Sequence, residues 1–403
     1  MLAALLTVVS SPMRAQRLGP VEERPPLRDV TDTNDARAYF DVGVSAFERD
    51  PDRAAAAFYW AARLNPAWGE ALYARRAALM MKDRGLRMQV YNGNRKTSPE
   101  MRRLDSLQFR ALMLSPFLFR RFDSEVLLSV IREDVIRRSR LNGDAEPGRG
   151  ELDYMIENYF RNSGDEMRGW LAYGRGNFGS ALEFYGRAVG SARYPSYLWL
   201  ERARIFGMRG EVDSAVVQFN LAIDAQRKQD QKDLVVFYDS KAQAEFSIGV
   251  LLEGRDNQSA AREAYGRALQ EDLSYYPAHM QLGLLALSTH DTTTAMSELA
   301  LAAQLAADEP HVRYMNGFVL AASRHYADAV VELKKAVELE PYYALPYLRL
   351  GQSYEQLDKG KEALAAYHGF LDRASKTDVQ RAATEERVSD ITAILAGKPA
   401  GTP

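Results

Sequence analysis

The chain has 403 residues, 46% of them apolar, no cysteine, and a formal net charge of −2 from 52 basic and 54 acidic side chains. This composition is typical of a folded protein, and the near balance of charge provides no overall attraction to nucleic acid or anionic lipid. The lack of cysteine excludes disulfides, thiolate metal sites and cysteine nucleophiles.

The N-terminus begins with a short apolar run from Leu2 to Val9, which ends at two serines and Pro12. This pattern is typical of a secretory signal peptide, with cleavage expected after Ala15, although no Lys or Arg precedes the run. The run is much shorter than the roughly 20 residues of a membrane-spanning helix, so no stable span is expected. A buried first helix or an interfacial anchor is the alternative.

Residues 16–35 mix glycine and proline with charged side chains, which predicts a disordered linker. From residue 36 onward, apolar side chains recur at intervals of three and four residues, and no stretch alternates with the period of two that a strand requires. The sequence therefore predicts an all-α fold, with the first helices over residues 36–82.

Residues 83–165 do not share the regular pattern of the rest of the chain. Between Asp83 and Asn142 there are 13 basic and seven acidic residues, a local charge of +6. The leucine and phenylalanine content is sufficient for two or three helices broken at Pro116. We predict a basic helical insert that packs on the other helices with its arginines in solvent, because charge runs usually mark solvated faces. The alternative is an element that docks a partner or an anionic surface.

The C-terminal half repeats with a period of 34 residues. The period is visible in a glycine column, Gly249, Gly283, Gly317 and Gly351, and in an alanine column, Ala261, Ala295, Ala329 and Ala363. A third column holds Tyr265, Leu299, Leu333 and Tyr367, and a fourth holds Ala268, Ala302, Ala336 and Phe370. Earlier copies contain Ala181, Tyr185 and Ala188, then Ala215, Phe219 and Ala222, and near the start Ala55, Tyr59 and Ala62. Small residues let two helices approach closely while the larger residue fills the gap between them.

This unit resembles the tetratricopeptide repeat, a pair of helices with Leu-Gly in the first helix and Ala, an aromatic residue, Ala and Pro in the second. Leu282 with Gly283, and Leu350 with Gly351, match the first motif, and Pro341 closes one copy in register. The Trp that the family places early in the repeat is absent. The resemblance implies an α-α superhelix, a solenoid in which residues 166–375 form the regular part.

Two further segments depart from the regular unit. Ala222 and Ala261 are 39 residues apart, 12 more than the pattern predicts, so we expect lengthened helices or a protruding loop. We predict a capping helix over residues 376–396, because a solenoid needs a polar outer face at its end. Val388 and Ile391 lie on the apolar side of this helix. Residues 397–403 predict a disordered tail.

No motif for catalysis, a metal or a cofactor emerges from the sequence. The five histidines include no pair at ligand spacing, and His279 and His311 are expected to face a groove or solvent. Residues 174–179 match G-x-G-x-x-G, but a dinucleotide site needs a preceding strand, whereas these glycines fall in a turn between two helices. We predict no enzymatic activity, no cofactor, no metal and no nucleic-acid partner.

The resemblance also indicates where a partner would bind, because members of this family generally receive peptides or protein segments on a concave groove lined by their first helices. On a helical wheel, the residues three before, one after and four after each first-helix glycine form one stripe. We call it the groove stripe, and it comprises Phe246, Val250, Glu253, Met280, Leu284, Leu287, Tyr314, Phe318, Ala321, Leu348, Gln352 and Glu355. Its apolar character predicts a site for an amphipathic helix or apolar peptide. Alternatively, tight curvature or the folded-back insert buries it as core.

Together these features predict a non-catalytic scaffold or adaptor of a bacterial cell envelope, periplasmic or secreted, that binds a protein or peptide partner and takes part in an envelope-associated assembly. The alternative is a ligand-capture protein, similar to the helical-repeat glycan-binding proteins of some bacterial envelopes, with a pocket built by the insert. Trp60, Trp68 and Trp170, which lie around the insert, favour this alternative.

Overall fold

The computed structural model describes residues 21–26, 32–91, 98–231 and 240–397. Within these ranges all regular secondary structure is helical, with 20 helices and no strand, so the predicted all-α fold is confirmed. The predicted signal peptide, and the predicted tail after residue 397, lie outside the described residues. No helix in these ranges is long and apolar enough to cross a membrane.

The described residues form 20 helices in chain order. The first three are α1 (Ala36–Ala46), α2 (Pro51–Leu64) and α3 (Gly69–Lys82), and the insert contributes α4 (Arg84–Tyr91), α5 (Pro99–Leu114), α6 (Arg121–Asn142) and α7 (Arg149–Arg161). Six pairs follow: α8 (Asp165–Gly174) with α9 (Phe178–Ala188), α10 (Ser196–Met208) with α11 (Val212–Asp230), α12 (Lys241–Glu253) with α13 (Gln258–Glu271), α14 (Tyr276–Ser288) with α15 (Thr292–Leu305), α16 (Pro310–Ala322) with α17 (Tyr326–Leu339), and α18 (Ala344–Gln356) with α19 (Gly360–Arg373). The last helix is α20 (Arg381–Leu395). With α1 and α2 as the first pair, all seven predicted copies are helix pairs.

The glycine column marks the point where the two helices of a pair come closest. A Cβ atom on Gly317 would lie 2.6 Å from Leu333, and one on Gly351 would lie 2.5 Å from the ring of Tyr367. A side chain at Gly283 would overlap Leu299 in the same way. The packing that the sequence columns predict is therefore present in these pairs.

The turn inside each pair uses left-handed backbone at one position of the repeat. Gly176 and Gly210 both have φ of 74° there, and the same position of later repeats holds non-glycine residues, His290 at 61° and Arg324 at 65° among them. Gly176 belongs to the G-x-G-x-x-G match, and α8 rather than a strand precedes it. The motif is a helix-to-helix turn, as expected.

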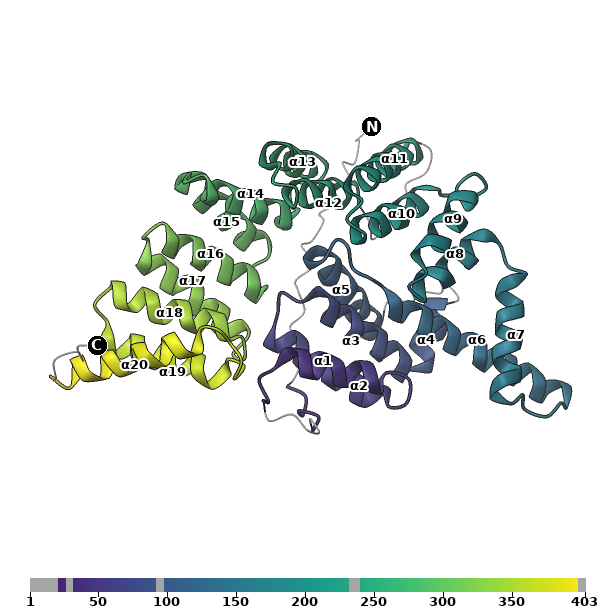
Figure 1. The fold of residues 1–403 in the computed structure, drawn as a ribbon, viewed down its shortest axis with the longest axis horizontal. Helices are drawn as coiled ribbons and strands as arrows, with labels where there is room; N and C mark the ends of the chain where they lie inside the picture. Colours follow the sequence, from purple (N-terminus) through teal and green to yellow (C-terminus); the bar gives the residue numbers. More distant parts are fainter. Residues whose placement is uncertain (1–20, 27–31, 92–97, 232–239, 398–403) are drawn as a thin grey trace, which may run out of the picture.

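The pairs from α8 to α19 form an arc, and α1, α2, α3 and α5 lie on its inner side (Figure 1). The insert contains four helices, and its expected break at Pro116 falls between α5 and α6. Helix α5 packs along α3, where Gly69 allows close approach to the Ala111 carbonyl. The first helices of the chain and part of the insert therefore occupy the space that the arc encloses.

Two of the irregular segments have the form that the sequence predicts. Helix α11 has 19 residues where α13 and α15 have 14 each, so a lengthened helix accounts for part of the extra spacing, and residues 232–239 lie outside the described ranges. The capping helix begins at Arg381, and Ile391 is its buried apolar contact.

The described parts of the predicted linker pack on the solenoid, which corrects the expectation of disorder there. The Glu22 carboxylate lies 2.6 Å from Arg75 Nη2. The backbone carbonyl of Glu22 accepts a hydrogen bond from Trp60 Nε1 at 3.1 Å. Farther along, Asp32 Oδ2 accepts from Ser375 Oγ at 2.7 Å. Charged residues order this segment because they find partners on the folded helices, although the segment has little apolar surface of its own.

Candidate functional site

The groove stripe divides into a buried column and two half-buried columns. The residues three before each glycine are core: Phe246, Met280, Tyr314 and Leu348 have exposed fractions of 3%, 8%, 8% and 5%. Val250, Glu253, Leu284, Leu287, Phe318, Ala321, Gln352 and Glu355 are half-buried.

The buried column packs between successive repeats. The ring centroid of Phe246 lies 5.4 Å from that of Tyr265 and 5.5 Å from that of Tyr275, and Tyr314 lies 5.4 Å from Tyr343. Such contacts are typical of a close-packed interior. This column is therefore core rather than binding surface, and the half-buried columns remain as the candidate.

Helix α5 already occupies part of the concave surface, here defined as the inward face of α12, α14, α16 and α18. Met113 packs against the cluster that holds Phe246 and also against the cluster that holds Met280, Leu284 and Leu287. The Leu112 carbonyl accepts a hydrogen bond from Gln243 Nε2 at 3.3 Å. Sequence analysis allowed for burial by the insert but did not identify the helix responsible.

A buried ion pair fixes α5 to the loop before α16. Arg110 Nε lies 2.6 Å from Glu309 Oε1, and Arg110 Nη2 donates to Glu309 Oε2 at 2.8 Å. The two side chains are only 10% and 8% exposed. Burial by itself lowers the pKa of Arg110, but the carboxylate of Glu309 outweighs it, so that the pKa is raised. The guanidinium stays charged, and its charge-assisted hydrogen bond joins α5 to this loop.

A second buried pair joins α2 to the loop before α18. Arg63 Nε lies 2.8 Å from Glu340 Oε2, and the exposed fractions are 8% and 4%. Beside it, the rings of Trp60 and Tyr342 meet edge to face with centroids 4.9 Å apart. Burial raises the pKa of Glu340, and Arg63 offsets only part of this effect. The inner helices therefore bridge two consecutive repeats of the arc.

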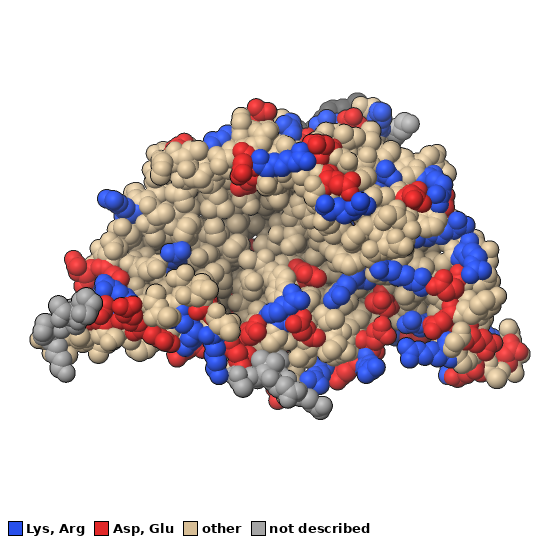
Figure 2. Space-filling model, in the orientation of Figure 1, with Lys and Arg blue, Asp and Glu red and all other residues tan. Residues whose placement is uncertain are grey.

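A hollow remains open beside these contacts. Figure 2 shows it between the arc of α14 to α18 and the inner helices, bordered mainly by uncharged residues. The half-buried residues Leu284, Leu287 and Phe318 belong to the helices that border it. At its C-terminal end Glu355 is paired with Arg387 of α20 at 2.5 Å, so the acidic end of the stripe is neutralised within the chain. The part of the groove stripe that stays accessible along the hollow is mostly apolar.

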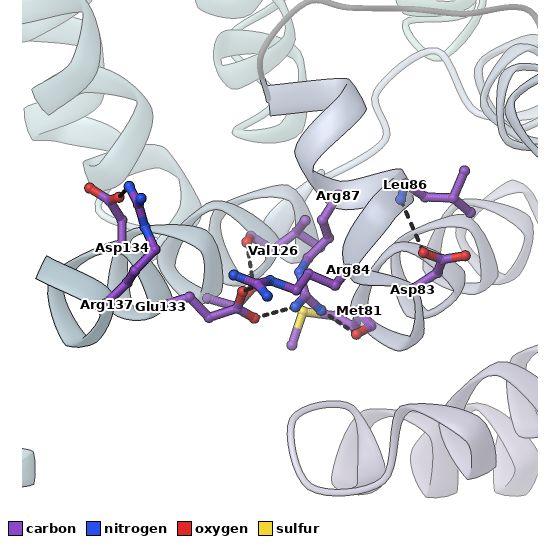
Figure 3. Close-up of polar contacts among 10 residues, drawn as sticks. Met81, Asp83, Arg84, Leu86, Arg87, Val126, Glu133, Asp134 and Arg137 are labelled. Atoms are coloured by element: carbon purple, nitrogen blue, oxygen red, sulfur yellow. Dashed lines mark hydrogen bonds and ion pairs between the residues drawn. The ribbon is translucent and has the colours of Figure 1, made fainter. Parts of the chain in front are cut away.

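Several arginines of the insert pair with carboxylates on neighbouring helices. Arg84 and Arg87 both pair with Glu133, and Arg87 also donates to the Met81 carbonyl (Figure 3). Arg120 pairs with Glu201, which joins the insert to α10. The insert packs on its neighbours. Arg84 is 66% exposed, as the expectation of solvated arginines requires, whereas Arg87 and Arg120 are only 8% and 19% exposed and depart from it.

Of the two histidines singled out in the sequence, His279 is buried and His311 is half-buried. His279 is 8% exposed, with Nδ1 2.6 Å from Glu298 Oε2 and Nε2 3.1 Å from the Leu273 carbonyl, so it does not face the groove. His311 Nδ1 lies 3.3 Å from the Tyr343 hydroxyl. Over the described part of the chain, no three His, Cys, Asp or Glu side chains gather into a metal-binding group.

Two of the three tryptophans considered as ligand-stacking residues, Trp60 and Trp68, pack against other aromatic rings. Trp60 is 2% exposed, and Trp68 stacks on Phe40 with centroids 4.6 Å apart. Both belong to the core of the first three helices or lie against it. They give no support to a glycan pocket.

No protein-family model and no curated protein matches this sequence. Solved structures similar to parts of the chain are tetratricopeptide-repeat proteins. One is YrrB, described as a TPR protein with an unusual peptide-binding site, at 17% identity, with a TM-score of 0.41 and coverage of 51% of this chain and all of YrrB. Another is the C-terminal part of a TPR repeat-containing protein from Cytophaga hutchinsonii, at 16% identity and a TM-score of 0.46, covering 59% of this chain and 88% of that one. MamA matches at 19% identity and a TM-score of 0.34, over 44% of this chain and 95% of MamA. At these scores the likenesses carry no argument about the site or the partner.

Proposed function

We propose that this protein is a non-catalytic scaffold that binds an amphipathic helical segment of a protein partner on its concave surface, beside α5. The observation that carries the proposal is α5 itself. It lies on the inward faces of α12 and α14 through Met113 and Leu112, as an amphipathic helix lies in a groove. The chain thus provides an internal example of the occupant that this surface accepts.

The hollow beside α5 offers the same chemistry on the next helices. Leu284, Leu287 and Phe318 present half-buried apolar surface along α14 and α16, and the Arg349 guanidinium lies 4.9 Å from the centre of the Phe318 ring. A partner helix with apolar residues three and four positions apart would cover this surface, and apolar burial would drive the association.

The binding test compares two double variants of the full chain in a pull-down from extract of the source cells, followed by quantitative mass spectrometry. Leu287→Gln with Phe318→Gln removes apolar surface from the concave side. Leu301→Gln with Val331→Gln is the matched control, because these residues are 42% and 51% exposed on the second helices α15 and α17. We expect the concave variant to retain about tenfold less of a specific partner than the wild type, and the control to retain it fully.

Equal recovery by all three proteins would contradict the concave site. Circular dichroism and the thermal midpoint establish that both variants fold, so that lost binding is not lost structure.

As part of the same proposal, the protein acts in the periplasm or outside the cell after cleavage of the signal peptide predicted from the sequence. The expected mature chain begins at Gln16. Intact mass of the protein purified from its source measures this directly, and a chain that retains residues 1–15 would contradict it.

A further inference from the structure

A pocket of about 420 Å³ lies where α7, α8 and α9 meet, at the opposite end of the molecule from α14 to α18 (Figure 1). Its volume falls within the range of roughly 300–1,000 Å³ that small-molecule sites occupy. Phe160 and Leu171, which are 2% and 6% exposed, supply apolar lining, and the partly buried ring of Phe184 adds to it. The insert contributes one wall, because Phe160 belongs to α7.

Three guanidinium groups, those of Arg161, Arg168 and Arg175, line the same pocket. Among the described lining residues the one carboxylate is Glu157, and it pairs with Arg175 at 2.5 Å. Arg168 Nη1 lies 3.5 Å from Asp165 Oδ1, outside the lining, so the surplus positive charge of the pocket rests on Arg161.

The two remaining arginines differ in how they are held. Arg168 Nη2 donates to the Arg161 carbonyl at 2.9 Å, and its guanidinium lies 5.7 Å from the centre of the Phe184 ring. Its Nε is buried without a hydrogen-bond partner among the described residues. The side chain of Arg161 is exposed and makes no ion pair within the same set. Arg168 is thus positioned in advance, and Arg161 is available to a ligand.

The turn between α8 and α9 distinguishes this pocket from a phosphate loop. Asn177 lines the pocket, but its side-chain oxygen accepts the Ser180 amide at 3.3 Å and so caps α9. The backbone amide of Ser180, which a phosphate would need as a donor, already donates to the Asn177 side chain. The recognition chemistry therefore lies with the arginines and the aromatic rings.

We propose that this pocket binds a small carboxylic acid whose body has an apolar face. The carboxylate would pair with Arg161 and Arg168, since the planar guanidinium matches the two oxygens of a carboxylate. The apolar face would pack on Phe160 and Phe184. Two sources share this chemistry, an acidic sugar and an aryl acid. The site is independent of the concave surface, and one can fail while the other holds.

The test measures binding to the full chain by calorimetry with four probes: glucuronate, phenylacetate, and their uncharged counterparts glucose and phenylacetamide. At least one acid should bind, and at least about tenfold more tightly than its counterpart. Arg161→Gln should weaken that binding by about tenfold. Arg149→Gln is the matched control, because Arg149 is an exposed arginine at the other end of α7.

Binding of glucuronate would identify an acidic sugar, and binding of phenylacetate an aryl acid. The proposal is overturned if neither acid binds at about 10 mM, where even weak specific complexes are detected. Equal binding of an acid and its uncharged counterpart, or an unchanged affinity in Arg161→Gln, would overturn it as well.

Discussion

His311 stands near the start of α16, with its ring stacked 6.2 Å from that of Tyr314 and its Nδ1 near the Tyr343 hydroxyl. Burial lowers the pKa of His311 to about 4 from its ordinary 6.5. The unfolded chain therefore takes up this proton first as the pH falls. The stability that the neutral ring contributes is complete above pH 6.5 and is lost between about pH 6.5 and pH 4.

We expect His311→Asn to reduce the dependence of stability on pH in this window. The asparagine cannot take up the proton. Between pH 7 and pH 4 the free energy of unfolding of the wild type should therefore fall by up to about 3 kcal/mol more than that of the variant. Urea denaturation of both proteins at a series of pH values measures the difference. Parallel pH profiles for the two proteins would show that this ring is not held neutral by the fold.

Individual residues also show the limit of the helical-wheel argument. Tyr314 and Phe318 lie on the same predicted stripe, yet Tyr314 is 8% exposed and packs on Tyr343 of the next repeat, while Phe318 is half-buried beside the hollow. A helical wheel places both residues on one side of α16, but it represents a single helix and does not show the packing of the next repeat. The distinction therefore depends on how the next pair is stacked.

At the scale of the helix pair, two glycines inside helices should respond in opposite ways to one methyl group. A Cβ on Gly283 of α14 would overlap Leu299 and lie 3.2 Å from the Ala295 carbonyl. On Gly266 of α13 a Cβ would meet no atom within 4 Å. Gly283→Ala should therefore lower the free energy of unfolding by about 1–3 kcal/mol, and Gly266→Ala should raise it by about 0.5–1 kcal/mol.

Thermal and urea unfolding of the two single variants measure these changes against the wild type. Because both substitutions are Gly to Ala in a helix, the difference between them isolates the close approach of α14 and α15. Equal changes in the two variants would contradict the close-packing account of the glycine column.

At the scale of the whole molecule, the buried pair of Arg110 and Glu309 joins the inner helices to the arc. Removal of one member leaves the other charge buried without its partner. Glu309→Ala should therefore lower the free energy of unfolding by about 3–5 kcal/mol. Replacement of both by apolar residues of similar size, Arg110→Met with Glu309→Leu, should recover most of that loss. Denaturant unfolding of the single and double variants tests the expectation.

A surface pair provides the control for this comparison. Asp41 lies 3.1 Å from Arg37 on α1, with both side chains more than half exposed, and Asp41→Ala should change stability by less than about 1 kcal/mol. A cost of the same size at Asp41 and at Glu309 would show that burial does not amplify the inner pair.

The sequence alone determined the helix pairs and the close contacts within them. These depend on residues a fixed short distance apart, such as Gly283 and Leu299, so that a repeated spacing records the contact. Only the tertiary structure decided what the arc encloses. Arg110 meets Glu309 across 199 positions, and Arg63 meets Glu340 across 277. Contacts between distant segments have no period, and many other arginines and carboxylates of the chain carry the same charges. The folded arrangement selects these pairs because it brings them together away from water, where the right partner offsets the cost of burying a charge.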